Sequence, residues 1–220
     1  MLFVQFHGAV AAVPESEISA LFDLWSSTQG SEWAPALNKS SCVYNETDLC
    51  QQVTGGAPWV FASPLNETQP CLPGSARWRG LNCSATDHIT GIILPFSGLN
   101  GTLPSGMCDL TALTVFSVTD NSLYGEIPSC ISKLSDLILL DLKSNSLSGP
   151  VPDAMWELTQ LRILALFHNH FTGSLAAGVG NLTNLIMLNL ASNLFSDQLP
   201  SELGRLGRIV YLPIGKVKLY

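Results

Sequence analysis

The stretch SDLILLDLKSNSLSGPVPDAMWEL, Ser135–Leu158, is one copy of a repeat that extends on both sides of it. Between Asp87 and Leu206, cutting the chain every 24 residues gives five segments that align without a gap. The shared pattern is L-x-x-L-x-L-x-x-N-x-L-x-G-x-[IVL]-P, a spacer and a closing leucine. The closing leucine recurs as Leu110, Leu134, Leu158, Leu182 and Leu206, and the asparagine as Asn121, Asn145, Asn169 and Asn193. A sixth copy, Gly207–Tyr220, begins in the same way and ends part-way through.

Self-similarity at this period predicts a leucine-rich repeat solenoid, in which each turn contributes one short strand to a curved parallel sheet. A single turn cannot bury its own apolar side chains, so the turns stack and share one core. We therefore expect an α/β fold: a right-handed superhelix with a parallel β-sheet on its concave face and a disulfide-stapled helical cap at its N-terminal end. Residues 1–13 are expected to form a signal-like segment, residues 14–86 the cap and residues 87–220 the repeats.

Composition excludes several classes of partner. Charged residues make up 12% of the chain, the formal net charge is −7, and lysine and arginine form no run. Nucleic acids and anionic membranes require a basic stripe, so neither is an expected partner. Met1–Val13 is apolar and ends in small residues, as a signal peptide does. At 13 residues it is too short to cross a membrane, and no later run reaches about 18 apolar residues.

Six cysteines and six N-x-[ST] triplets favour secretion through an oxidising compartment. The triplets give the candidate glycosylation sites Asn38, Asn45, Asn66, Asn82, Asn100 and Asn181. Six cysteines allow 15 connectivities. The pairs we predict close two short loops in the cap and join corresponding points of adjacent repeats. They are Cys42–Cys50, Cys71–Cys83 and Cys108–Cys130. An intracellular scaffold with free thiols and unmodified asparagines is the contrary hypothesis.

The cap begins with a predicted amphipathic helix, Glu15–Thr28. Ile18, Leu21, Phe22 and Trp25 recur at helical spacing on one face of it. That face is expected to cover the end of the solenoid core, which would otherwise meet water. The following stretch, residues 34–80, has no periodicity and few aliphatic residues, so disulfides are its expected stabilisers.

Three stretches of the cap and first repeat follow one another between Ile18 and Pro104: ISALFDLWSSTQGSEW, PCLPGSARWRGLNC and ITGIILPFSGLNGTLP. The motif C-x(n)-W-x-G-[VL]-x-C falls on Cys71, Trp78, Gly80, Leu81 and Cys83. In this order they resemble the plant-type extracellular leucine-rich repeat proteins: receptor-like kinase ectodomains, receptor-like proteins and polygalacturonase-inhibiting proteins. The resemblance implies extracellular recognition, in receptor-type signalling at a plasma membrane or as inhibition of a foreign secreted enzyme.

The repeat pattern also separates structural from functional positions. The asparagine column is expected at a tight turn, where each amide bonds the free backbone groups of the adjoining coil. The glycine of L-x-G-x-I-P permits a backbone turn that lets a second short strand run beside it. Neither column is expected to contact a ligand.

Strand residues alternate between faces, so the variable positions of L-x-x-L-x-L-x-x-N should project from the concave sheet face. These positions combine an aromatic centre at Phe167 with polar neighbours, a composition that suits a peptide or protein ligand. A sheet face that is merely solvated is the alternative. The predicted ligand contacts are Ser117, Thr119, Asp120, Asp141, Lys143, Phe167, His168 and Asn189.

Catalysis, metal binding and cofactor binding are not expected. His168 and His170 flank Asn169, whose inward position makes the two imidazoles diverge. The sequence has no nucleophile-elbow, phosphate-loop or zinc-protease motif, and an open sheet has no pocket that excludes water.

These observations predict a secreted or cell-surface glycoprotein module that binds a peptide or protein on its concave face. A structural cell-wall or matrix spacer without a specific ligand is the second hypothesis. The sixth turn opens with apolar residues but does not close before Tyr220. An uncapped core edge promotes aggregation, so we expect the natural chain to continue or to pair that edge with another chain.

Overall fold

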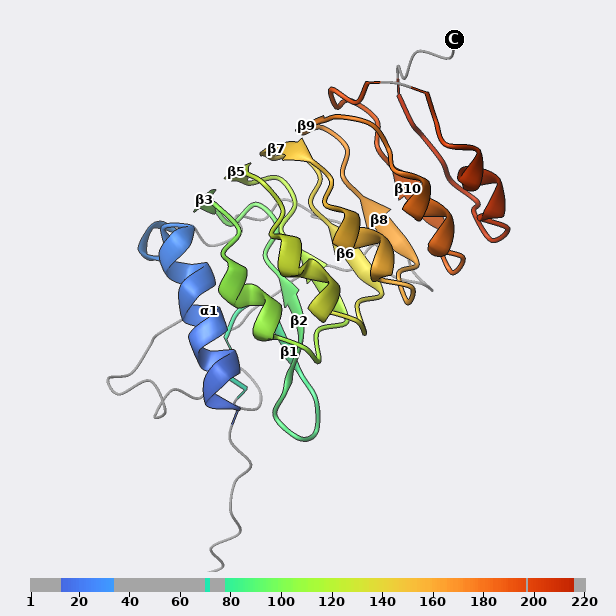
Figure 1. Cartoon of the computed structure of the whole chain (residues 1–220). Coiled ribbons are helices and arrows are strands. Elements are labelled where there is room, and N and C mark those ends of the chain that lie inside the picture. Colours follow the sequence, from blue (N-terminus) through green and yellow to red (C-terminus); the bar gives the residue numbers. More distant parts are fainter. Residues whose placement is uncertain (1–12, 34–69, 72–77, 197, 216–220) are drawn as a thin grey trace, which may run out of the picture.

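A computed structural model of the chain describes residues 13–33, 70–71, 78–196 and 198–215. Most of the predicted signal-like segment lies outside these residues, as do the predicted pair Cys42–Cys50 and the sequons at Asn38, Asn45 and Asn66. Figure 1 shows the described part as a stack of similar turns with one helix, α1, at its N-terminal end.

The larger of two sheets has six strands in the order β1-β2-β4-β6-β8-β10. All neighbours in it are parallel except β1 and β2, which run antiparallel. The parallel pairs join positions one repeat apart, so the predicted parallel sheet is confirmed. The strands are β1 (Leu81–Cys83), β2 (Ile89–Ile93), β4 (Val115–Ser117), β6 (Leu139–Asp141), β8 (Ile163–Ala165) and β10 (Met187–Asn189).

A second, four-stranded sheet follows the asparagine turns, as the glycine motif predicts. Gly125 and Gly149 each have φ of 79°, a left-handed conformation that glycine adopts without steric cost. The strands, all parallel, are β3 (Asn100–Gly101), β5 (Ser122–Gly125), β7 (Ser146–Pro150) and β9 (His170–Thr172).

The spacer of each repeat forms a short 3-10 helix. Each begins directly after the proline column, or after Ala176 where that column departs from proline. Among the described residues, α1 is the only α-helix. The 3-10 helices are η1 (Gly30–Glu32) in the cap and η4 (Ser105–Asp109), η5 (Ser129–Lys133), η6 (Asp153–Glu157), η7 (Ala177–Asn181) and η8 (Ser201–Arg205) in the repeats.

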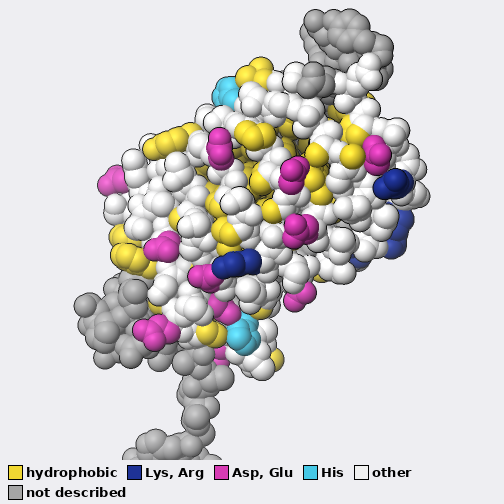
Figure 2. Space-filling view, viewed as in Figure 1, with side chains coloured by type: hydrophobic (Ala, Val, Ile, Leu, Met, Phe, Trp, Pro, Cys, Tyr) yellow, Lys and Arg dark blue, Asp and Glu magenta, His cyan; other side chains and the backbone are white. Residues whose placement is uncertain are grey.

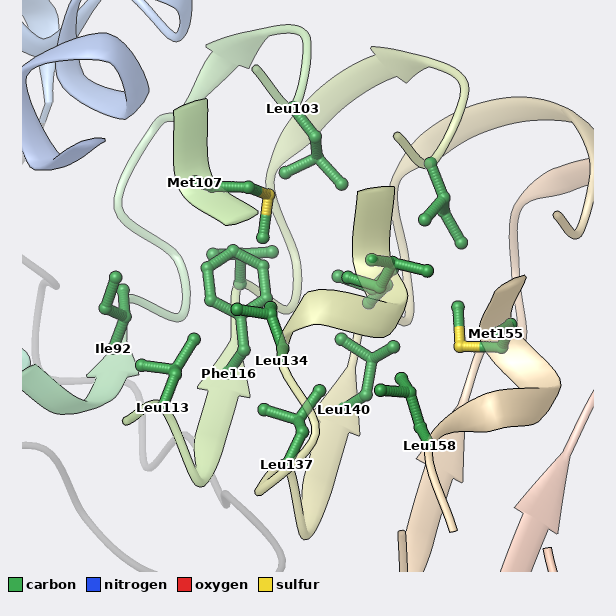
Figure 3. Packing of buried hydrophobic residues seen from close by; sticks show 14 of the residues in the cluster. Ile92, Leu103, Met107, Leu113, Phe116, Leu134, Leu137, Leu140, Met155 and Leu158 are labelled. Atoms are coloured by element: carbon green, nitrogen blue, oxygen red, sulfur yellow. The ribbon is translucent and has the colours of Figure 1, made fainter. Parts of the chain in front are cut away.

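One apolar core runs through all the turns, between the larger sheet and the 3-10 helices. In Figure 3 the side chains of Met107, Phe116, Leu134 and Leu140 lie together in the core and come from η4, β4, the C-cap of η5 and β6. Each is at most 1% exposed. Fully burying a side chain of this kind contributes about 1.5–3 kcal/mol, so stacking of turns stabilises what no single turn could.

The asparagine column bonds the backbone as predicted. Asn145 Oδ1 accepts the backbone N–H of Leu123 at 3.0 Å. Its Nδ2 donates to the carbonyl oxygens of Val118, Leu142 and Lys143 at 2.9, 3.1 and 3.2 Å. Asn121, Asn169 and Asn193 make the corresponding bonds to the preceding turn.

Helix α1 (Glu15–Ser27) confirms the predicted cap helix and packs against η4. Ile18 and Leu21 are buried as expected, and Leu24 completes the buried face. Phe22 and Trp25 are only half-buried and stack on each other with ring centroids 6.0 Å apart. The buried face is therefore rotated slightly from the prediction, toward Leu24.

A buried carboxylate ties α1 to the first repeat. The side chain of Glu17 is 5% exposed, and its two oxygens contact His88 Nδ1 and accept the backbone N–H of Ile89, both at 2.7 Å. Because the ring of His88 and the backbone N–H of Ile89 both contact this carboxyl group, Glu17 positions the helix over the end of the core.

We expect Glu17→Gln to lower the free energy of unfolding by about 1.5 kcal/mol, because an amide NH₂ would replace one of the two carboxyl oxygens that now contact His88 Nδ1 and the backbone N–H of Ile89. Urea unfolding measures the loss. Glu15→Gln is the matched control, since Glu15 is exposed in the same helical turn. A loss for Glu17→Gln no larger than that for Glu15→Gln would contradict the clamp.

Two of the three predicted disulfides are confirmed. Cys71–Cys83 staples the cap, and Cys108–Cys130 joins η4 to η5 across neighbouring turns. The described residues contain no free cysteine. Such bonds persist in oxidising compartments, which agrees with the setting inferred from the sequence.

The sixth turn packs against the fifth through Ile209, Leu212 and Ile214, which are partly buried against the core. Val210 and Tyr211 remain 84% and 51% exposed. Continuation of the chain, or pairing of this edge with another chain, stays a prediction. Within the part of the chain that is described, no helix has the length and apolar character to cross a membrane.

Candidate ligand-binding face

The concave face is the side of the larger sheet that points away from the core. Along β6, Leu140 belongs to the core cluster, whereas its neighbour Leu139 belongs to a separate apolar cluster. Side chains of one strand alternate between the two sides of a sheet, so Leu139 and Asp141 lie together on the concave face. This assignment holds for the equivalent positions of β4, β8 and β10 because the strands pair in register.

Four of the predicted contacts are buried. Ser117 and Asp141 are 0% exposed, Thr119 is 1% and Asn189 is 7% exposed. Asn189 Oδ1 accepts the backbone N–H of Ala191 at 3.2 Å, two residues further on. Asp141 makes the corresponding bond to Lys143 N at 3.2 Å. Both side chains therefore also help to end their strands.

Asp141, Lys143 and Phe167 form a compact group on the face. Lys143 Nζ lies 3.5 Å from Asp141 Oδ2 and 5.9 Å from the centroid of the Phe167 ring. Burial of the carboxyl raises the pKa of Asp141 to about 6, against the opposing effect of the Lys143 charge. Ser117, the register partner of Asp141, has a buried Oγ without a hydrogen-bond partner.

Asp120 and His168 differ from the prediction that they project from strands. Both have φ of 54° and lie in the left-handed turn that precedes the asparagine column. They are not fully buried, and the His168 ring meets Phe167 edge-on with centroids 5.2 Å apart. The eight predicted residues thus divide between the sheet and the turns at its edge.

The sequence interpretation missed an apolar row on the concave face. Register pairs connect one position on each of the strands β4, β6, β8 and β10, and an isolated bridge adds a fifth position in the next turn. We call them the apolar row: Val115, Leu139, Ile163, Met187 and Tyr211. Leu139 and Ile163 are buried, Val115 and Met187 partly buried, and Tyr211 is 51% exposed. The sequence feature that could have revealed the row is the apolar residue directly before the second leucine of L-x-x-L-x-L. At this position a sheet face that contacts only water carries polar residues.

Other parts of the described chain offer weaker candidate sites. No group of three or more His, Cys, Asp or Glu within the described ranges could hold a metal ion. A hollow of about 10 Å³ beside Leu175, Phe195 and Ile214 has room for one water at most. Figure 2 shows acidic side chains scattered over the visible side rather than gathered in one patch.

The repeats match the family models described as leucine rich repeat over residues 111–171 and 184–206. A probable LRR receptor-like serine/threonine-protein kinase from Arabidopsis thaliana is 36% identical over 74 residues. That match covers 31% of this chain, and the chain spans only 8% of the relative's length.

Two solved structures show the same architecture. The ectodomain of the Arabidopsis thaliana membrane receptor kinase GASSHO1/SCHENGEN3, in complex with CASPARIAN STRIP INTEGRITY FACTOR 2, is 33% identical over 64% of this chain and 17% of its own, with a TM-score of 0.62. A plant ice-binding protein is 25% identical over 93% of this chain and 57% of its own, with a TM-score of 0.70. Motif, fold and matches together show that the chain has the leucine-rich repeat fold and resembles plant-type extracellular leucine-rich repeat proteins.

Proposed function

We propose that this chain is an extracellular recognition module of receptor type, which binds a peptide or protein ligand on its concave face. The main observation that supports this proposal is the apolar row. It lies on the opposite side of the sheet from the core and continues over four neighbouring strands and one isolated bridge. Leu139 and Ile163 form a cluster separate from the main core, and Val115, Met187 and Tyr211 keep part of their apolar surface exposed beside it. Contiguous apolar surface of this kind marks interaction sites.

The surroundings of the row suit peptide recognition. Lys143, Phe167 and His168 follow the strands that carry the row and supply one cation and two rings, and Asp120 adds a carboxyl group at the turn. Aromatic anchors supply most of the binding energy at such interfaces, while polar neighbours orient the partner. The positive charge of Lys143 is compensated by Asp141, which favours an uncharged ligand segment at this point.

Two further observations support an extracellular receptor context. The GASSHO1/SCHENGEN3 ectodomain was solved in complex with CASPARIAN STRIP INTEGRITY FACTOR 2, and the curated relative is described as a probable LRR receptor-like serine/threonine-protein kinase. The two disulfides favour an oxidising compartment. An ice-binding protein has a similar fold, so the fold alone does not indicate a peptide or protein ligand. The proposal therefore depends on the residues of the concave face.

The test is a selection of displayed random peptides on the secreted, disulfide-bonded chain, followed by titration of the selected peptides. We expect Met187→Glu and Phe167→Ala each to weaken binding at least tenfold, about 1.4 kcal/mol or more. Leu194→Glu is the control, because Leu194 is 60% exposed and lies next to the second sheet. It should leave binding unchanged.

Two outcomes would count against the proposal. Peptides that bind Met187→Glu and Phe167→Ala as tightly as the unmodified chain would place the ligand elsewhere. Failure to select any peptide above the background of the reduced, unfolded chain would favour the wall or matrix spacer. Inhibition of a foreign secreted enzyme remains one form of the same recognition and is tested by adding that enzyme to the panel.

A further inference from the structure

The apolar row continues at its N-terminal end into a sequon. Val115 pairs in register with Gly91, and Gly91 pairs with Asn82 on β1. Asn82 is therefore placed two strands before Val115 along the same row. Asn82-Cys83-Ser84 fits the N-x-[ST] pattern, and Asn82 is exposed.

The side chain of Asn82 lies over the position that Gly91 leaves empty. A Cβ on Gly91 would lie 3.0 Å from both Cβ and Nδ2 of Asn82, closer than nine in ten real contacts of a Cβ atom. Nδ2 is the atom that carries an N-linked glycan. The missing side chain of Gly91 thus makes room for the Asn82 amide at the end of the concave face.

We propose that Asn82 carries an N-linked glycan that closes the N-terminal end of the apolar row, so that a ligand occupies the row from Val115 onward. In this modification Nδ2 loses a proton and bonds to the anomeric carbon of a lipid-diphosphate-linked oligosaccharide. The lipid diphosphate leaves with the electron pair of the broken C–O bond. A bulky, hydrated oligosaccharide excludes a ligand from the surface beneath it.

The other described sequons lie away from the row. Asn100 is exposed on β3 of the second sheet, and Asn181 is exposed at the end of η7. Glycans at these two positions would leave the concave face open. The assignment of the row to a ligand rests on the proposed function, whereas the modification of Asn82 does not depend on it.

The first experiment measures occupancy by mass spectrometry of glycopeptides from protein secreted by a eukaryotic host. We expect a glycan on Asn82 in the unmodified chain and in Ser84→Thr, which keeps the sequon, and its loss in Asn82→Gln. An unmodified Asn82 in the secreted chain would overturn the proposal.

The second experiment measures access to the row with a polyethylene-glycol maleimide. Labelling of Val115→Cys should be several-fold slower in the glycosylated chain than with Asn82→Gln added. Labelling of Met187→Cys, three strands further along the sheet order, should be equal in the two backgrounds. Equal rates at Val115→Cys would show that the glycan does not close the row.

A third measurement covers the case in which Val115→Cys is not secreted. Hydroxyl-radical footprinting of the unmodified side chains should then show Val115 protected, relative to Met187, by the intact glycan. Trimming the glycan with an endoglycosidase should remove that protection, and unchanged protection would overturn closure of the row. None of these readouts requires a ligand, so their failure is distinguishable from failure of the proposed function.

Discussion

Asn145→Ala should lower the free energy of unfolding by about 3–5 kcal/mol, one of the largest losses available at a residue outside the leucine columns. Asn145 is 8% exposed and makes four hydrogen bonds to the backbone of two neighbouring turns. Its removal leaves the buried N–H of Leu123 without this acceptor and opens a cavity between the turns. A buried polar group that loses its partner costs about 1–3 kcal/mol by itself.

Asn184→Ala is the matched control for this prediction. Asn184 Nδ2 also donates to a backbone carbonyl, that of Thr159 at 2.9 Å, but at an exposed site where water can replace the amide. Urea unfolding should show a loss below about 1 kcal/mol for it. Hydrogen exchange should accelerate at Leu123 in Asn145→Ala only. Equal losses for the two variants would show that the asparagine column does not hold the turns together.

The repeat predicts most of the fold because the spacing of its residues shows which side chains are buried. Leucines at fixed intervals must lie inside a stack of turns, and a column of asparagines among them must satisfy backbone groups there. The same logic identified the cap helix and the pairs Cys71–Cys83 and Cys108–Cys130. Each of these inferences needed only which residues recur and how far apart they are.

The concave face was harder to predict because its properties depend on backbone angles and on neighbours from other repeats. Strand alternation alone cannot show that Asp120 and His168 enter a left-handed turn, since any of several residue types can occupy it. Nor does the sequence show that a polar position such as Asp141 is buried. Reading one more column across the repeats would have shown the apolar row.

The buried position of Asp141 carries the second large prediction. Its pKa rises to about 6 chiefly because burial disfavours the charged carboxylate, and the nearby charge of Asp120 adds to that effect. Lys143 opposes the rise but does not cancel it. Between pH 4 and pH 6 the folded chain therefore keeps a proton at this site that the unfolded chain, with an ordinary pKa of 3.8, has lost.

Because the folded state binds more protons in this window, the contribution of Asp141 to stability falls as pH rises from about 4 to 6 and is constant above it. A pKa difference of about 2 corresponds to about 3 kcal/mol. We therefore expect Asp141→Asn to be more stable than the unmodified chain at pH 7–8, by up to this amount, and to match it near pH 4. Unfolding by urea across this range measures the difference. Asp136→Asn, at an exposed site, should show no such pH-dependent gain. The contrary result is a stability difference between Asp141→Asn and the unmodified chain that turns against the variant as the pH rises from 4 to 7. It would show that the ion pair with Lys143 outweighs burial and that the carboxylate stabilises the concave face.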